Sequence, residues 1–426
     1  MTSIDIRHGD CLTVLRELPD NSVDSVVTDP PYGLSNTKPA QVADVLAAWV
    51  TGDTEAVPAK KGGFMGKDWD CFVPPPAVWA ECLRVLKPGG HMAVFAGART
   101  QDLMGLSIRL AGFEIRDTLG WVYGSGFPKS MDVSKAIDKA AGAERATKLV
   151  PSAATAYAAS AGNHRPWMDE ASANGGMRAV AGDTPATDEA QKWSGWGTAL
   201  KPAIEPIILA RKPLDGTVAA NVLAHGVGGL NIDACRVAGA KPDTTRGASV
   251  NASSMAGPLG GQGSIIDDGK GRFPANVLLD EHAAKEMDEQ SGVLKSGAHK
   301  AGQPRNAQSK SSFTLNDTTT YSDSGSEGGA SRFFPVFKYQ AKAPKKERPV
   351  IVREDGTKIA HPTVKPVALM EWLVTLITPE GGTTLDQFAG TGTTLQAARD
   401  KGFNAIGVEK DEDYLALIEQ RLEIVA

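Results

Sequence analysis

The sequence contains few cysteines and no two of them in the C-x-x-C spacing. The four, Cys11, Cys71, Cys82 and Cys235, are scattered over 426 residues. Structural zinc sites and disulfide frameworks need cysteines in closely spaced sets, so this distribution favours neither, and we expect no bound metal. Isolated cysteines of this kind suit a reducing cytoplasm.

The sequence also lacks an apolar run long enough to cross a bilayer, and its start, MTSIDIRHGD, has no apolar stretch like that of a secretory signal. We therefore expect a cytoplasmic protein with no membrane partner. An excess of basic charge is missing as well, because 45 Lys and Arg face 50 Asp and Glu, for a formal charge of -5. A surface that binds nucleic acid would have to be local.

Both ends of the chain show alternating strand and helix patterns. The expected strands are residues 22–29, 91–97, 383–390 and 404–409, and the expected helices are residues 78–86, 394–402 and 413–422. The first of these helices is followed by KPGG (87–90), which is typical of a helix end. Such alternation indicates an α/β fold, in which helices cover a mainly parallel sheet.

The middle of the chain, between about residues 140 and 335, loses this alternation and is rich in Ala, Gly, Ser and Thr. A short repeat, AANVL at 219–223 and PANVL at 274–278, predicts two similar strand starts. Basic residues outnumber acidic ones between Gly292 and Arg348. Taken alone, this excess favours a solvated linker over a surface that follows DNA phosphates.

The segment DQFAGTGTTLQAA (386–398) predicts a corner that binds a nucleotide. A strand is expected to end at Phe388, and Gly390 and Gly392 let the backbone turn sharply and approach a ligand. A helix is expected to begin near Thr394 with its free N–H groups facing the same point.

Two phosphate-binding interpretations of this segment are disfavoured. A Walker loop requires a lysine where Thr393 stands, and a dinucleotide fingerprint requires a third glycine where Leu395 stands. Glu409 closes the next expected strand, near the ~20-residue separation of an acid that accepts from ribose hydroxyls. We expect a nucleoside ligand without a pyrophosphate; the alternative is a glycine-rich turn with a solvent-facing glutamate.

A second segment, VVTDPPYG (26–33), runs from an apolar strand into an acid, two prolines and an aromatic ring. The prolines stiffen the backbone and remove two N–H donors. Asp29 then offers a carboxylate, Pro30 a carbonyl and Tyr32 a flat face just beyond the strand. Two acceptors beside a ring suit the exocyclic amine of adenine or cytosine. The alternative is an Asp-Pro-Pro turn that merely ends a strand.

DPPY at 29–32, together with FAGTGTT at 388–394, resembles the motifs of the S-adenosylmethionine-dependent DNA amino-methyltransferases. The target-base motif precedes the cofactor motif, which is the order of their permuted β group. HGDCL (8–12), LRVLKPGG (83–90) and HPTVKP (361–366) with the helix VALMEWLVTLI (367–377) extend the resemblance. GFMGKDWD (63–70) and LKPAIEPIILARKP (200–213) look like segments of phage and prophage members.

The resemblance implies a role for each matching residue. Asp29 and Pro30 would bind the amine, Pro31 would shape the turn, and Tyr32 would stack on the base. The residues implied to bind S-adenosylmethionine are Asp386, Phe388, Gly390, Gly392, Thr393 and Thr394 at its methionine and ribose side, Glu409 at the ribose hydroxyls, Asp10 at the adenine, and His361, Thr363 and Lys365 at the methionine end. Asp10 as a helix cap and Lys365 as a surface cation are the alternatives.

The resemblance further implies site-specific methylation of double-stranded DNA at adenine N6, because DPPY accompanies adenine targets more often than cytosine N4. Cytosine-N4 methylation by the same machinery, methylation of a glutamine amide or of RNA, and a non-catalytic DNA-binding regulator remain alternatives. A bacterial or phage-encoded enzyme of the nucleoid is expected, without a restriction enzyme in the same chain. Because relatives in the β group often dimerise, the resemblance also implies a homodimer or a higher homo-oligomer.

The expected fold is a Rossmann-like α/β sheet assembled from both chain ends, with an inserted target-recognition region. Its parts are residues 1–140 (N-terminal catalytic part), 141–199 (Ala/Gly-rich insertion), 200–213 (catalytic strand), 214–332 (target-recognition region) and 333–426 (C-terminal catalytic part with the cofactor motif). If residues 214–332 recognise the target, the basic excess after Gly292 would contact DNA. Gly62, Gly63 and Gly66 around Phe64 and Lys67 predict a lid, or a plain connection.

Overall fold

The computed structural model describes residues 2–35, 37–58, 70–124, 126, 130–151, 177–237, 271–295, 327–337, 348–353, 355–361 and 363–423. They fall into two compact units. The first comprises Met1–Gly124, Ile204–Glu347 and Thr363–Ala426, and the second comprises Ser125–Ala203 and Arg348–Pro362. The glycines of the predicted lid and most of the basic stretch after Gly292 lie outside the described residues.

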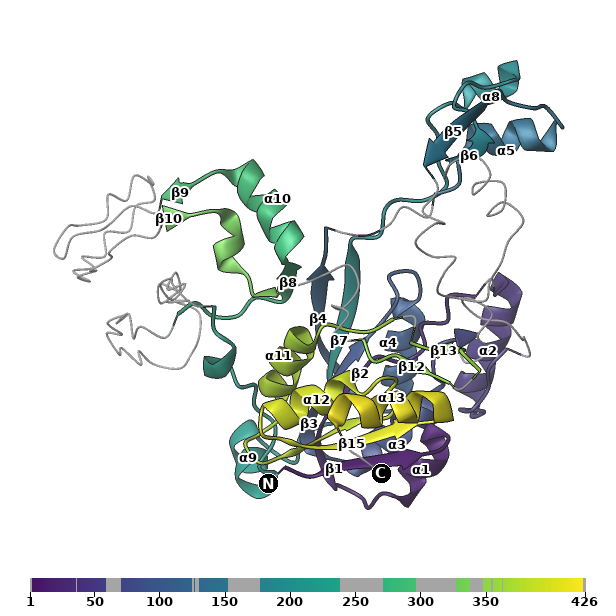
Figure 1. Ribbon diagram of the computed structural model, residues 1–426. Coiled ribbons are helices and arrows are strands. Elements are labelled where there is room, and N and C mark those ends of the chain that lie inside the picture. The colour runs from purple at the N-terminus through teal and green to yellow at the C-terminus, as the bar shows by residue number, and fades with distance from the viewer. Residues whose placement is uncertain are drawn as a thin grey trace, which may run out of the picture. The chain divides into compact units, whose positions relative to one another are not determined.

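A nine-stranded sheet forms the centre of the first unit, in the order β1-β15-β14-β2-β3-β7-β4-β8-β11 (Figure 1). Strand β7 runs antiparallel to both of its neighbours, and the other neighbouring pairs are parallel. The strands are β1 (Ile4–His8), β2 (Val23–Thr28), β3 (Leu86–Phe95), β4 (Glu114–Val122), β7 (Ile204–Arg211), β8 (Val277–Asp280), β11 (Val336–Phe337), β14 (Thr383–Asp386) and β15 (Asn404–Glu409). The expected Rossmann-like sheet assembled from both chain ends is confirmed.

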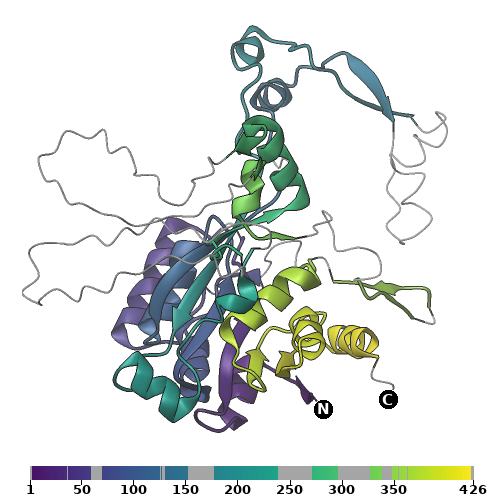
Figure 2. The same cartoon turned by 90° about the vertical axis from the view of Figure 1, so that its left-hand side faces the viewer.

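Helices cover both faces of this sheet (Figure 2). On one face, apolar side chains of α1 (Cys11–Glu17), α2 (Pro39–Thr51), α3 (Pro76–Val85) and α4 (Gln101–Leu110) form a core with the strands. On the other face the core is built by α11 (Val367–Ile377), α12 (Thr393–Asp400) and α13 (Glu412–Leu422). Alternate side chains of a strand point to opposite faces, so Val26 joins the first core and Val27 the second.

The direction of the chain connections reverses between β14 and β2. From β14 the chain passes through α12 to β15, whereas from β2 it passes through α3 to β3 on the opposite side. Open α/β sheets bind ligands at such a switch point, outside the carboxyl ends of the strands. Asp29 and Gln387 directly follow the carboxyl ends of β2 and β14, so the fold brings the two motifs to one crevice edge.

Smaller elements complete the first unit. They are α9 (Val218–His225), the 3-10 turns Asp233–Cys235 and Ala330–Phe333, α10 (Glu281–Ser291), and the short strands β9 (Leu294–Lys295) and β10 (Glu327–Gly328). Strands β9 and β10 pair antiparallel. Helix α10 follows β8 directly, and Asp280 caps it by accepting from the N–H of Ala283 at 2.6 Å.

The second unit contains α5 (Val133–Ala140), β5 (Thr147–Pro151), β6 (Met177–Ala181), α8 (Asp188–Lys192) and the hairpin of β12 (Ile351–Val352) and β13 (Lys358–Ile359). A buried ion pair joins Asp138 on α5 to Arg145 at 2.6 Å. The same carboxylate accepts from the N–H groups of Ala186 and Thr187 and from the Thr187 hydroxyl. These bonds fix the start of α8 against α5.

The element boundaries confirm several predictions and correct others. Helix α11 and strand β15 begin and end where the sequence predicts. The strand before the glycine segment ends at Asp386, two residues earlier than expected, and KPGG lies inside β3 rather than ending a helix. AANVL (219–223) was expected to start a strand but lies in α9, because Thr217 caps a helix there by accepting from the N–H of Ala220.

Packing of α12 on β15 depends on the absence of a side chain at Gly407. A Cβ at this position would lie 2.5 Å from Cδ1 of the fully buried Leu395. We predict that Gly407→Ala lowers the free energy of unfolding by roughly 1–3 kcal/mol, the usual cost of overpacking a core. Urea denaturation measures this. Gly229→Ala, where an added Cβ meets no atom within 4 Å, is the matched control; equal midpoints for the two variants would contradict the packing described.

Candidate active site

Two hydrogen bonds and one glycine fix the loop that follows β2. The N–H of Gly33 donates to Oδ1 of Asp70 at 2.8 Å, and the Thr100 hydroxyl donates to the carbonyl of Tyr32 at 2.6 Å. Gly33 has a φ of 65°, and a Cβ there would lie 2.7 Å from the backbone of Phe72. Only glycine fits this position without strain, so the chain holds Asp29 to Tyr32 in a defined turn.

The loop that follows β14 is equally specific. Gly390 and Gly392 have φ angles of 55° and 74°, a region that favours glycine. A Cβ at Gly392 would lie 2.9 Å from Cγ2 of Ile418 on α13. Gly392 also caps α12, so Thr393 and Thr394 form its first turn. The free N–H groups of this helix start therefore face the end of β14.

Asp386 ties the two loops together. Its carboxylate is 3% exposed and accepts from the hydroxyl of Thr28 at 2.8 Å and from that of Thr394 at 2.5 Å. A third bond comes from the N–H of Phe388 at 3.1 Å. Burial raises the pKa of Asp386 to about 6, although these three bonds oppose the rise. Because Thr28 immediately precedes Asp29, the bond holds the target-base motif beside the glycine loop.

Glu409 lies at the end of β15, and its carboxylate turns back toward the glycine loop. Oε2 accepts from the N–H of Gly390 at 2.7 Å, and Oε1 accepts from the N–H groups of Lys410 and Asp411 at 2.9 and 2.8 Å. Burial raises the pKa of Glu409, and the backbone bonds act in the opposite direction. Carboxylate oxygens can each accept a further bond, so this group can also receive hydroxyl donors from a ligand.

Asp10 and Glu409 share one edge of the site. Asp10 caps α1 by accepting from the N–H of Leu12 at 3.1 Å, and it pairs with Nζ of Lys410 at 3.2 Å. The neighbouring Gly9 donates its N–H to the carbonyl of Glu409 at 3.0 Å. The capping role anticipated for Asp10 is confirmed, and the same position keeps its carboxylate near the predicted cofactor loop.

Lys365 lies against the predicted target-base motif. Its ammonium donates to Oδ2 of Asp29 at 2.7 Å and to the Tyr32 hydroxyl at 3.0 Å, and it lies 3.3 Å from Oε2 of Glu205. The Tyr32 hydroxyl in turn donates to Oδ1 of Asp29 at 2.8 Å. Lys365 was predicted among the residues at the methionine end, so its position adds a contact that the sequence did not indicate.

Glu205 is a site residue that the sequence analysis missed. The sequence predicts site residues such as Asp29 just beyond the carboxyl end of a strand, whereas Glu205 lies near the start of β7. Because β7 is antiparallel to β3 and β4, its start lies at the edge where those strands end. A strand direction is not readable from local sequence. The feature of the sequence that marks Glu205 is its position as the one acid in IEPIILAR, second in that mostly apolar stretch.

The charges in this group are set by mutual contact. Burial alone would lower the pKa of Lys365, but the carboxylates of Asp29 and Glu205 outweigh it and raise that pKa, so the side chain stays an ammonium. Burial, followed by the same two carboxylates, raises the pKa of Tyr32 well above its ordinary value. Tyr32 is therefore a phenol that donates, and Lys365 cannot take up a proton.

Two further predicted residues precede Lys365. His361 is half-buried in the second unit, and Thr363 is exposed in the first. Their proposed contact with the methionine end of a cofactor stays a prediction. Within the described ranges, no group of three or more His, Cys, Asp and Glu side chains is arranged to hold a metal ion, and no helix there is long and apolar enough to cross a membrane.

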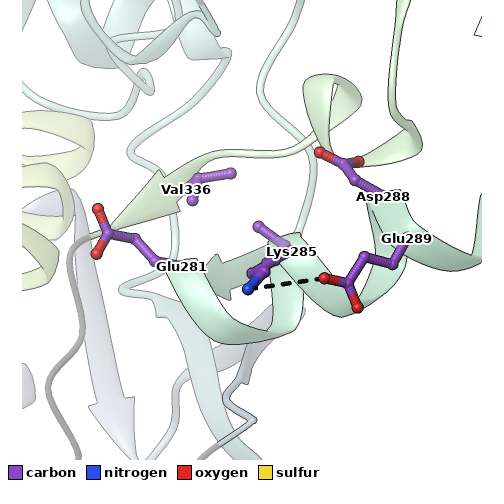
Figure 3. A pocket seen from close by; sticks show the side chains of 6 residues that line it. Glu281, Lys285, Asp288, Glu289 and Val336 are labelled. Carbon is purple, nitrogen blue, oxygen red and sulfur yellow. Dashed lines mark ion pairs between the residues drawn. The ribbon is translucent and has the colours of Figure 1, made fainter. Parts of the chain in front are cut away.

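A hollow of about 570 Å³ lies on α10, away from the predicted residues in sequence (Figure 3). It is lined by Glu281, Ala284, Lys285, Asp288, Glu289 and Val336. Lys285 pairs with Glu289 across 3.7 Å along the same helix. The hollow contains none of the motif residues and is lined mostly by charged side chains. The crevice edge after β14 and β2 therefore remains the candidate active site.

Comparison with known proteins adds sequence relatives. Residues 260–420 match the family N6_N4_Mtase, described as DNA methylase. The type II methyltransferase M.ScaI of Streptomyces caespitosus is 39% identical over 74 residues, which are 17% of this chain and 24% of M.ScaI. The type II methyltransferase M2.DpnII of Streptococcus pneumoniae is 41% identical over 63 residues, 15% of this chain and 24% of that protein. The chain thus spans about a quarter of the length of these relatives.

Solved structures give a distant likeness. The crystal structure of the M1.HpyAVI–SAM complex has a TM-score of 0.39 and 13% identity, over 99% of this chain and 100% of that one. The cytosine-N4-specific PvuII DNA methyltransferase has a TM-score of 0.43 and 12% identity, over 100% of this chain and 89% of that one. Likenesses with scores this low carry no conclusion about the site.

The buried carboxyl of Asp386 predicts a pH-dependent stability. Burial raises its pKa from an ordinary 3.8 to about 6 in the folded protein. Between these values the folded state holds a proton that the unfolded state has released, so this group makes the fold less stable as the pH rises from about 4 to 6. Asp386→Asn lacks this proton binding and keeps the size of the side chain.

The free energy of unfolding of Asp386→Asn, relative to the unchanged protein, should therefore increase by up to about 3 kcal/mol across that window and stay level above pH 6. Urea denaturation at a series of pH values from 4 to 7 measures the difference. A difference that does not vary with pH would show that Asp386 has no raised pKa.

Proposed function

We propose, on the premise that residues 260–420 belong to the N6_N4_Mtase family of DNA methylases, that this protein transfers a methyl group from S-adenosylmethionine to the N6 amine of adenine in duplex DNA. The observation that carries this proposal is the buried bond between Thr28 and Asp386, 2.8 Å long. It joins the carboxylate and proline carbonyl of an amine-binding motif to a glycine loop suited to a nucleoside.

S-adenosylmethionine, when bound, supplies an electrophilic methyl group. The residues at the glycine loop fit its nucleoside half, because Glu409 offers carboxylate oxygens to ribose hydroxyls and the start of α12 offers N–H groups. The loop residues proposed to hold it are Asp386, Phe388, Gly390, Gly392, Thr393 and Thr394. The two carboxylates, the buried Asp386 and the half-buried Glu409, would repel a phosphate at this position, which agrees with a nucleoside that carries none.

At the reacting amine, Asp29 and the carbonyl of Pro30 would each accept one hydrogen bond. The amine lone pair of an aromatic base is delocalised into the ring, and two acceptors favour a more tetrahedral nitrogen with a localised lone pair. They also stabilise the positive charge that develops as the nitrogen attacks. Tyr32 would stack on the base, which offsets the cost of removing it from the duplex.

Target choice would reside elsewhere in the chain. A pocket that holds one flipped base cannot select a sequence, so another segment must contact base edges and phosphates. We assign this role to residues 214–332, which include β8 and α10 at one side of the sheet. The basic excess that begins after Gly292 suits a partner made of phosphates. Adenine is proposed over cytosine because of the DPPY motif.

Nucleoside analysis tests the proposal. The purified protein is incubated with mixed-sequence duplex DNA and isotopically labelled S-adenosylmethionine, and the digested nucleosides are identified by mass spectrometry. Labelled N6-methyl-2′-deoxyadenosine is the expected product. Label on N4 of cytosine would keep the mechanism and overturn the choice of base. A protein that binds the cofactor but leaves no label in DNA would overturn the proposed activity.

Removal of the Asp29 carboxylate should abolish transfer without disrupting the fold. Asp29 is at the surface of the crevice, with a side chain that is 22% exposed. We predict that Asp29→Ala lowers kcat by at least roughly 10²- to 10³-fold, the usual effect of losing one group that stabilises developing charge. Binding of S-adenosylmethionine, measured by calorimetry, serves as the control and should change little. Retained turnover in this variant would contradict the role of Asp29.

A further inference from the structure

The ammonium of Lys365 makes one of the two contacts that the proposed function assigns to the amine of the target base, the one with Asp29. It donates to Asp29, whose other oxygen accepts from Tyr32. It also lies 5.3 Å from the centroid of the Tyr32 ring and 4.8 Å from that of Phe95. A protonated amine held by a carboxylate beside aromatic faces resembles an exocyclic amine held by the same carboxylate.

We propose that Lys365 occupies the amine position when no base is present, and that it moves onto Glu205 when the base enters. The inference rests on the proposed function, because it requires a base amine as the entering group. Lys365 and Glu205 are then positioning residues: they act through Asp29 and leave the reacting atoms to it.

The lysine has to leave Asp29 for transfer to occur. Both carboxylate oxygens of Asp29 already accept bonds at 2.7 and 2.8 Å, from Lys365 and Tyr32. A cation bonded to Asp29 also opposes the positive charge that develops on an amine attacking beside it. An amine that entered with Lys365 in place would therefore compete with the ammonium for Asp29, and its transition state would be disfavoured.

Glu205 provides the place to which the lysine can go. Its Oε2 already lies 3.3 Å from Nζ of Lys365, so a small side-chain rotation exchanges one carboxylate for the other. The side chain of Lys365 is only 12% exposed and that of Glu205 is 28% exposed. A charge this far from water needs a partner, and Glu205 supplies one without moving Lys365 to the surface.

The arrangement excludes a different role for Lys365. A lysine that accepted the proton released by the base amine would need to be neutral before the reaction. Asp29 and Glu205 together raise the pKa of Lys365 despite its burial, so it stays protonated at the pH of the reaction. Lys365 can therefore only donate, either to Asp29 or to Glu205.

The test compares Glu205→Gln with the double variant Lys365→Met/Glu205→Gln in the intact protein. Glu205→Gln keeps the size of the side chain and removes its charge, so Lys365 should stay on Asp29 and kcat should fall about tenfold. The KM for DNA should change little, since phosphate contacts set it. In Lys365→Met/Glu205→Gln no lysine competes for Asp29, so kcat should recover above that of Glu205→Gln alone.

Turnover is measured with labelled S-adenosylmethionine and a plasmid that the unchanged protein methylates, and circular dichroism checks the fold. Glu371→Gln, which breaks the 3.2 Å pair of Glu371 with Lys401 on the outside of α11, is the matched control. If Glu205→Gln fails to fold, Glu205→Asp and Glu205→Ser replace it. The inference then predicts a kcat equal to that of the unchanged protein for Glu205→Asp, which keeps a carboxylate, and a loss of activity for Glu205→Ser, which does not.

Three outcomes overturn the inference. A kcat unchanged in Glu205→Gln shows that the lysine needs no second partner. A double variant no faster than Glu205→Gln shows that Glu205 acts on the base or on the fold by itself. Absence of methylation by the unchanged protein removes the proposed function and the inference with it, whereas normal methylation with either of the first two results removes the inference alone.

Discussion

The hydrogen bond from Thr28 to Asp386 is the contact on which the rest of the site depends. The two residues are separated by most of the chain, yet they lie at adjacent strand ends and are both buried. A buried carboxylate is costly unless hydrogen bonds compensate it, and Asp386 receives three. Because those donors come from β2, from the glycine loop and from the first turn of α12, satisfying one charge fixes three segments together.

The sheet order explains how motifs at opposite chain ends build one crevice. Strands β14 and β15 come from the C-terminal end and insert between β1 and β2 from the N-terminal end. Adjacent parallel strands put their carboxyl ends at one edge, where the chain direction reverses. The order of the motifs along the chain is thus irrelevant to the geometry of the site, which only requires that β14 and β2 be neighbours.

Local sequence predicted the elements whose patterns are strong and missed features set by tertiary contacts. Helix α11 is apolar at every position except Glu371 and Thr375, and its bounds are those expected, as are the bounds of β15. AANVL and PANVL share four letters, but AANVL lies in α9, which Thr217 caps, whereas PANVL runs into β8, which begins at Val277. Glu205 escaped prediction because its place follows from the antiparallel direction of β7. Lys365 was predicted as a site residue, but its bond to Asp29 was not, because the two lie 336 residues apart in the chain.

A crystal structure of the protein with S-adenosylhomocysteine would test most directly the claim that the two motif loops form one site. The account predicts ribose hydroxyls against Glu409 and a sulfur atom that faces Asp29 and Pro30 across the crevice. Binding of the nucleoside at the α10 hollow, or with its sulfur turned away from Asp29, would contradict it.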